Sequence, residues 1–83
     1  MPEITRFYGI TIRIFFRGEH NPPHIHASYG EFAGVIEIAT LRMIEGDLPP
    51  RVQEMVREWG ENYRTELQTM WDTRTLIKLP PLP

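Results

Sequence analysis

The first half of the chain alternates between apolar and polar residues. From residue 10 to residue 17 the aliphatic residues hold one parity and mostly polar residues hold the other. A period of two is typical of a half-buried β-strand. A shorter run over 4–8 precedes this one, and Gly9 between them predicts a bend. The chain therefore begins with two predicted strands.

Two further alternating runs, over 24–29 and 32–38, flank Gly30-Glu31. Glycine at the first position of a two-residue loop favours a type II′ turn, so these runs predict a β-hairpin. Residues 17–23 are rich in turn-forming residues and predict a loop before the hairpin. A short strand around 43–45 is expected to continue the meander.

The register of this hairpin decides which side chains share a face of the sheet. It pairs His24 with Glu37 and His26 with Val35 on one face. The large apolar residues of both strands then lie on the other face, which we expect to be covered by a helix.

The second half of the chain has the period of a helix. Apolar residues recur at spacings of three and four from Val52 to Trp71, which keeps them on one helix face for about five turns. Asp47-Leu-Pro-Pro is a suitable entrance, because proline is tolerated in a first turn. Gly60 weakens the middle of this helix by roughly 1 kcal/mol relative to alanine, so a break near Gly60 is an open alternative. We assign the aromatic residues of the helix to the core.

Together these elements predict an α+β fold, an antiparallel β-meander of three to five strands with a long C-terminal helix packed on one face. A chain of 83 residues has room for one hydrophobic core. Residues 1–77 are expected to form this single domain. Residues 78–83 form a proline-rich tail that is expected to be extended or disordered.

Composition narrows the classes of function. The net charge of −2 gives no global electrostatic reason to bind nucleic acid. Because the chain has no cysteine, disulfides and thiolate chemistry are excluded. A protein without disulfides is compatible with a reducing cytosol. No signal peptide is recognisable, and no apolar run approaches the ~20 residues of a membrane span. We therefore expect a cytoplasmic protein without a membrane partner.

Three histidines around a Pro-Pro bend are the most distinctive chemical feature. His24 and His26 lie two apart on a predicted strand, about 6.7 Å apart at the backbone, so both can reach one metal ion. His20 would return across the bend as a third ligand, with Glu37 as a fourth ligand or as the carboxylate that fixes a histidine tautomer. The candidate metal ligands are thus His20, His24, His26 and Glu37, and the candidate cofactor is zinc.

Metal-free alternatives remain open for the same histidines. An HxH pair on a strand also occurs without metal, in which case Glu37 or the backbone would hold His24, and His20 and His26 would be ordinary exposed residues. Histidine without a metal can also act as a general acid, as a general base or as a hydrogen-bond donor to a phosphate group.

Arg13, Phe15 and Arg17 share the parity opposite to the core and are expected beside the histidines. Basic residues interleaved with an aromatic residue can contact phosphate and stack on an RNA base. The candidate catalytic residues of a small ribonuclease or phosphodiesterase are therefore His24, His26, Arg13 and Arg17. The alternatives are a solvated sheet face, or an interface with a protein partner or a second copy of the chain.

The segments HNPPHIHASYGEF, MPEITRFYGI and IEGDLPPR closely resemble a small bacterial family, domain-of-unknown-function family 4160. The resemblance covers almost the whole chain. It implies a stand-alone cytoplasmic protein whose gene often neighbours that of a second small protein, as in a toxin–antitoxin pair. The Thr-Gly-Glu turn of the family is Thr40-Leu41-Arg42 here, so we expect the tight turn with its glycine to be lost.

The first function hypothesis is therefore a regulatory or protein-interaction module of a toxin–antitoxin-like pair, acting in a partner complex or as a homodimer. The alternative is a small histidine-dependent ribonuclease or phosphodiesterase, or a zinc-binding protein.

Overall fold

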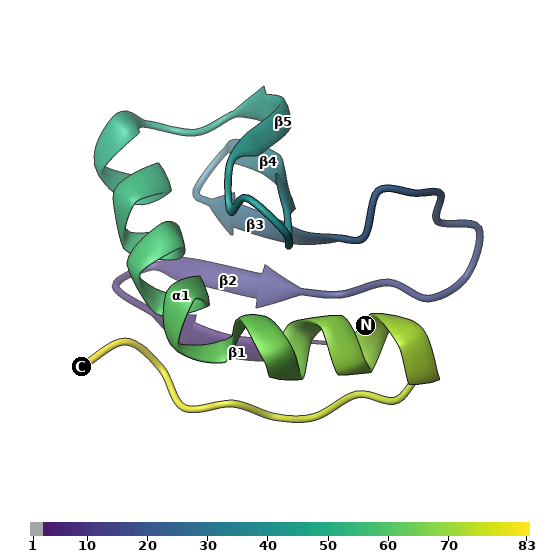
Figure 1. Ribbon diagram of the computed structural model, residues 1–83. Coiled ribbons are helices and arrows are strands. Elements are labelled where there is room, and N and C mark those ends of the chain that lie inside the picture. Colours follow the sequence, from purple (N-terminus) through teal and green to yellow (C-terminus); the bar gives the residue numbers. More distant parts are fainter. Residues whose placement is uncertain (1–2) are drawn as a thin grey trace.

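The computed structural model describes residues 3–83 and contains one sheet and one long helix (Figure 1). The elements in chain order are β1 (Glu3–Phe7), β2 (Ile10–Arg13), β3 (His24–Tyr29), β4 (Phe32–Glu37), β5 (Met43–Asp47) and α1 (Pro50–Thr73). The strands form an antiparallel sheet in the order β1-β2-β3-β4-β5. The predicted α+β meander is confirmed, with five strands. Residues 1 and 2 of the predicted domain lie outside the described residues.

The hairpin of β3 and β4 has the predicted register. His24 pairs with Glu37 and His26 with Val35. On the other side of β3, strand β2 places Arg13 opposite His26. His26 therefore lies in the middle of a row of three outward-facing residues on neighbouring strands.

Strand β2 is shorter than the alternation predicts, since it ends at Arg13 rather than near residue 17. Beyond this point the chain leaves β3, and the carbonyl oxygen of Phe16 accepts a hydrogen bond from the Arg74 guanidinium just after α1. Ile14 stays fully buried. The alternation thus predicts the burial of Ile14 correctly, although the strand pairing ends one residue earlier.

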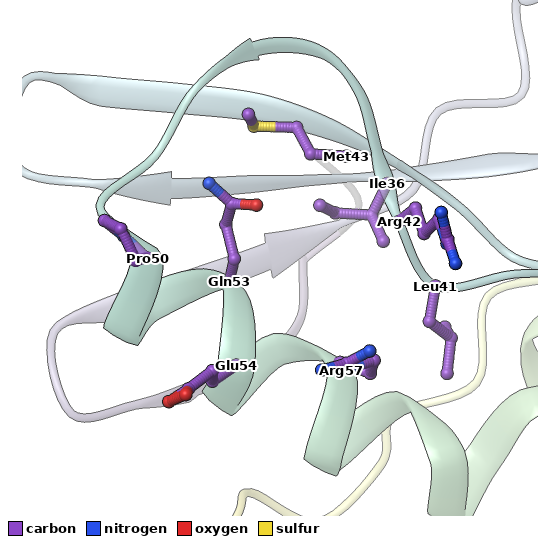
Figure 2. A pocket seen from close by; sticks show the side chains of 8 residues that line it. All are labelled: Ile36, Leu41, Arg42, Met43, Pro50, Gln53, Glu54 and Arg57. Carbon is purple, nitrogen blue, oxygen red and sulfur yellow. The ribbon is translucent and has the colours of Figure 1, made fainter.

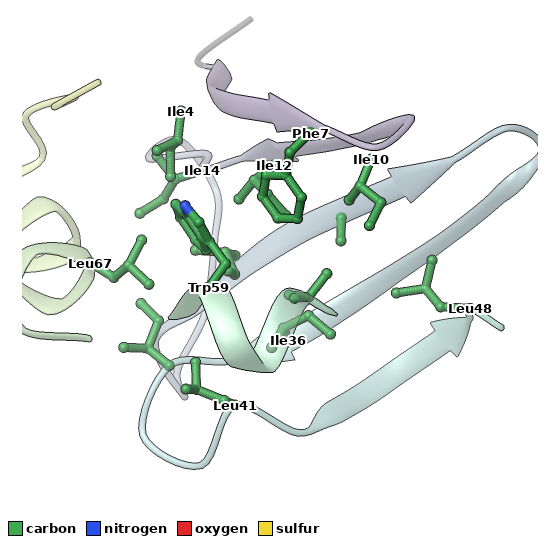
Figure 3. Packing of buried hydrophobic residues seen from close by; sticks show 14 of the residues in the cluster. Ile4, Phe7, Ile10, Ile12, Ile14, Ile36, Leu41, Leu48, Trp59 and Leu67 are labelled. Atoms are coloured by element: carbon green, nitrogen blue, oxygen red, sulfur yellow. The ribbon is translucent and has the colours of Figure 1, made fainter. Parts of the chain in front are cut away.

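Helix α1 covers the inner face of the sheet. Trp59 is completely buried among residues of the first strands (Figure 3). Its ring centroid lies 6.0 Å from that of Phe7 and 5.5 Å from that of Tyr63. The assignment of the helical aromatic residues to the core is confirmed for Trp59 and Trp71, which are buried.

The irregularity of α1 lies at Tyr63, whose φ of −132° and ψ of 19° are not helical. Gly60 itself is helical and buried. A Cβ atom at Gly60 would lie 2.7 Å from Cδ2 of Leu41. The glycine therefore lets the turn after β4 pack closely against the helix, and the kink falls three residues later.

The turn after β4 stays tight without a glycine, contrary to the expectation. Leu41 itself adopts the left-handed conformation with φ of 60°. Its amide donates to the carbonyl of Glu37 at 2.7 Å, and the Glu37 amide donates to the carbonyl of Arg42 at 2.9 Å. Burial of the Leu41 side chain against the core offsets the strain of this conformation.

We predict that Gly60→Ala lowers the free energy of unfolding by about 1 kcal/mol, although alanine is the better helix former. The added methyl group would overlap the buried Leu41 side chain. Urea denaturation measures the change. In a Leu41→Ala background the overlap disappears, so there the same substitution should stabilise the helix. Stabilisation in both backgrounds would show that Leu41 does not restrict Gly60.

The residues after α1 turn back and run alongside the helix in the opposite direction (Figure 1, yellow). The predicted tail, 78–83, is extended and packs on the domain. Trp59 Nε1 donates to the carbonyl of Pro80 at 2.8 Å, and the Leu79 amide donates to the carbonyl of Ile4 in β1 at 3.4 Å. Within residues 3–83, no helix has the length and apolar character that a membrane span requires.

Candidate metal centre

A long loop, residues 14–23, connects β2 to β3 and projects beyond the sheet (Figure 1). Because β2 and β3 are antiparallel neighbours, the loop must return to the start of β3. On this return it brings Glu19 against His24 and His26, whose side chains leave β3 on the same face.

Three potential ligand atoms converge at this point. Oε1 of Glu19 lies 2.6 Å from Nε2 of His26 and 3.1 Å from Nε2 of His24. All three atoms lie within 4.8 Å of one another. Within residues 3–83, no other set of three or more histidine or carboxylate groups converges in this way. We call Glu19, His24 and His26 the convergent triad.

The second nitrogen of His24 determines what the triad can do. Nδ1 lies 2.8 Å from the carbonyl oxygen of Pro22, and since a carbonyl can only accept, Nδ1 must carry the proton. In the neutral ring, Nε2 then presents a lone pair to the Glu19 carboxylate, which is also an acceptor. Two acceptors 3.1 Å apart require a cation, which is either a second proton on His24 or a metal ion bound to both groups.

Aromatic rings surround the two histidines. His24 is a buried residue, 8% exposed, and its ring centroid lies 4.9 Å from that of Trp71. The His26 ring contacts Phe15 edge to face at 4.6 Å. Both histidines leave β3 on the predicted face, but His24, at the start of the strand, also contacts Trp71 near the end of α1. This packing restricts both imidazoles to few rotamers.

The electrostatics of Glu19 follow from the same geometry. Partial burial would raise the pKa of this carboxyl, but hydrogen bonds and positive charge from His26 and His24 outweigh burial and hold the pKa of Glu19 below its usual range. Glu19 is therefore an ionised carboxylate at neutral pH, the form that binds a cation.

The triad lies within the part of the chain that a family model matches. Residues 9–72 match the family described as "Domain of unknown function (DUF4160)". The chain belongs to this family. The resemblance inferred from the sequence is thus confirmed, and the DUF4160 match includes the whole loop and hairpin that build the triad. No curated protein and no solved structure matches the chain.

The other two predicted metal ligands of this DUF4160 chain lie outside the triad. His20 is exposed and lines a hollow of about 260 Å³ onto which the triad opens. The Glu37 carboxylate accepts a hydrogen bond from Thr40 Oγ1 at 2.9 Å, so it is held in the turn after β4. The strand register pairs the backbones of Glu37 and His24, but the local turn decides where this carboxylate lies.

The two predicted arginines are separated by the early end of β2. Arg13 remains on the sheet, opposite His26. Arg17 is an exposed residue of the loop. The structure therefore brings together His24, His26 and Arg13 of the four candidate catalytic residues.

Glu19 was not among the predicted site residues, because the sequence placed it in the loop over 17–23. The signal that could have found this residue is topological. A loop between antiparallel neighbours must pass the start of the second strand, and Glu19 is the one acidic residue among loop residues 14–23.

A larger hollow, of about 400 Å³, lies between the first turns of α1 and the strands β4 and β5 (Figure 2). No histidine lines it. Gln53, on its helical side, donates to the carbonyl of Leu48 at 2.7 Å and so helps to hold the start of α1. This hollow has one carboxylate in its lining, Glu54, and therefore lacks a convergent set of ligand atoms like that of the triad.

Proposed function

We propose that this protein binds one divalent transition-metal ion, zinc in the first place, through Glu19 and the Nε2 atoms of His24 and His26. The observation that carries the proposal is the hydrogen bond from His24 Nδ1 to the Pro22 carbonyl, which leaves Nε2 as a ligand aimed at an ionised carboxylate. Histidines that bind metals usually donate their other ring N–H in this way.

The donor set fits zinc. Two imidazoles and one carboxylate form a set that catalytic zinc sites use. The same set can bind Fe²⁺, and a comparison of the two ions is part of the test. The ligand set proposed here replaces His20 and Glu37 of the sequence prediction with Glu19.

Three protein ligands leave one position of a tetrahedral zinc ion open to water. The hollow of about 260 Å³ beside the triad gives that position access to solvent. A zinc-bound water is acidic enough to supply hydroxide near neutral pH. The hydrolytic alternative, a small phosphodiesterase, would use this property, with Arg13 beside His26 on the phosphate.

The test is a competition titration of the untagged protein against a chromophoric chelator, with Zn²⁺ and Fe²⁺ in separate series. We predict that the wild-type protein binds one equivalent of zinc. Glu19→Gln, His24→Gln and His26→Gln should each weaken binding by more than about 100-fold, beyond the loss typical of an outer-shell partner. Circular dichroism of each variant establishes that it is folded.

His20→Ala and Glu37→Gln are the matched controls, because both residues lie near the triad and neither belongs to it. Each should change the affinity by less than about tenfold. If either control loses as much affinity as Glu19→Gln, the ligand set is wrong. A wild-type protein that binds neither ion would contradict the proposal as a whole.

A second candidate function is a protein-interaction module of a toxin–antitoxin-like pair, favoured by the contrast between the two edges of the sheet. The tail lies along β1, whereas β5 is an exposed edge strand, with Ile44 48% exposed. An uncovered edge can pair with a strand of another chain. Light scattering after size exclusion, alone and with the neighbouring gene product, tests this candidate. A protein that stays monomeric and forms no complex with the neighbouring gene product would refute this candidate.

A further inference from the structure

A second pocket adjoins the convergent triad on the outer face of the sheet. Its volume is about 220 Å³. Side chains from three neighbouring strands and the start of the long loop line it: Arg13, Phe15, His26, Ser28, Ala33 and Val35. Most of this lining is apolar, and one residue in it, Arg13, carries a permanent positive charge.

The hydrogen bonds of Arg13 are incompletely satisfied. Its Nη1 donates to the hydroxyl of Ser28 at 3.2 Å. Its Nε is enclosed by protein and has no acceptor. No carboxylate within residues 3–83 lies at ion-pair distance from this guanidinium. A half-buried charge without a counter-ion is costly.

Other arginines of the chain do not share this situation. Arg6 and Arg51 are exposed and pair with nearby glutamates. Arg74 is also exposed and donates to a backbone carbonyl. Arg13 stands apart as a half-buried arginine that has one hydroxyl partner and an unpaired Nε and that lines a pocket.

We propose that this pocket binds a small organic oxyanion, a carboxylate or phosphate group carried on an apolar body about the size of one aromatic ring. The oxyanion would neutralise the charge of Arg13, which lines the pocket. The apolar body would lie over Ala33 and Val35, beside the Phe15 ring.

The volume supports a ligand of this size. The pocket is larger than the ~150 Å³ cavity that accommodates benzene. It is smaller than the ~300–1,000 Å³ of sites for drug-sized ligands. A single ring with one charged group therefore fits, whereas a polymer would need a longer groove.

The oxyanion site and the proposed metal centre are neighbours, since His26 lines both this pocket and the hollow at the triad. The oxyanion site consists of Arg13 and the rest of the pocket lining and requires no metal. The two proposals can therefore fail separately.

The test is an NMR titration of ¹⁵N-labelled protein, metal-free and zinc-loaded, with benzoate and with phenyl phosphate. We expect saturable shifts at the amides of Ser28, Ala33 and Val35 with at least one of the two probes, and the stronger binder identifies the preferred oxyanion. Inorganic phosphate lacks the ring and benzyl alcohol lacks the charge. Each should bind at least about tenfold more weakly, the factor that corresponds to about 1.4 kcal/mol.

Two variants address the pocket by different means. Arg13→Gln removes the charge and should weaken binding at least about tenfold, because hydrogen bonds to charged groups contribute about 1.5–3 kcal/mol. Ala33→Leu adds bulk at an exposed position of the lining and should block the pocket without disturbing the core. Arg17→Gln, in the loop and outside the lining, is the matched control and should bind as the wild type does.

Unchanged binding in both Arg13→Gln and Ala33→Leu would overturn the proposal, and so would the absence of binding by both ring oxyanions. Binding seen with the zinc-loaded protein alone would also overturn it, because the ligand would then be held by the metal. If the metal-free protein binds the probes and no zinc binds to the triad, the metal proposal fails and the oxyanion site stands.

Discussion

Gly46→Ala is expected to lower the free energy of unfolding by about 3 kcal/mol, the sum of backbone strain and a steric overlap. Gly46 lies in β5 with φ of 98°, a backbone conformation that residues with a side chain rarely adopt. A Cβ atom there would lie 2.4 Å from the carbonyl oxygen of Ala33 and 2.7 Å from Cα of Gly34. Both are backbone atoms of the paired strand, so the sheet itself would have to move.

This loss is large for a small domain. Stabilities of about 0.05–0.15 kcal/mol per residue leave a chain of 83 residues with roughly 4–12 kcal/mol in all. Gly30→Ala is the matched control, because Gly30 also has a positive φ, of 57°, but no atom lies within 4 Å of its Cβ position. It should cost about 1 kcal/mol. Equal losses for the two variants in urea denaturation would contradict the role of close strand approach at Gly46.

Removal of Leu79–Pro83 is expected to cost about 3 kcal/mol of stability. Trp59 is 0% exposed, and its indole N–H donates to the carbonyl of Pro80. Without the tail this donor loses its partner, at a cost of about 1–3 kcal/mol. Leu79 and Leu82 also pack against the core, and the apolar contact that they provide would be lost.

Removal of Leu82 and Pro83 alone is the control for this truncation. It removes the hydrogen bond from the Tyr8 hydroxyl to the backbone oxygen of Pro83 and the contact of Leu82 with the core. It leaves Leu79 and the Pro80 carbonyl that accepts from Trp59 in place. We expect a loss of about 1 kcal/mol. The measurement is chemical denaturation followed by tryptophan fluorescence, which also reports whether Trp59 becomes exposed. A five-residue truncation as stable as the full chain would show that the tail does not support the core.

The hairpin could be predicted in detail because two local signals agree. Gly30, whose φ of 57° suits the first position of the turn, fixes the loop length. The period of two then determines which face each residue occupies. His24, His26 and their strand partners follow from these two facts alone.

The position of Glu19 could not be predicted in the same way, because no local pattern specifies the path of residues 14–23. That path depends on contacts between segments far apart in the chain. The Phe16 carbonyl is held by Arg74, 58 residues later. The contact between His24 and Trp71 is a second example. It forms because the end of the helix reaches the start of β3.

The conformation of the tail could be predicted from the sequence, but its position on the domain could not. Its prolines exclude a helix and predict an extended chain, and the structure agrees. Its docking site depends on the indole of Trp59, 21 residues before Pro80. Side-chain pairing at such distances leaves no periodic signal in the sequence.

The most direct test of the metal centre is ¹⁵N NMR of the histidine rings during titration with one equivalent of zinc. We predict that the Nε2 signals of His24 and His26 shift on binding, that Nδ1 of His24 stays protonated on the Pro22 carbonyl, and that the His20 ring is unaffected. Zinc that leaves all three rings unchanged, or that binds His20 in place of His24 or His26, would contradict the assignment of the convergent triad as the metal site.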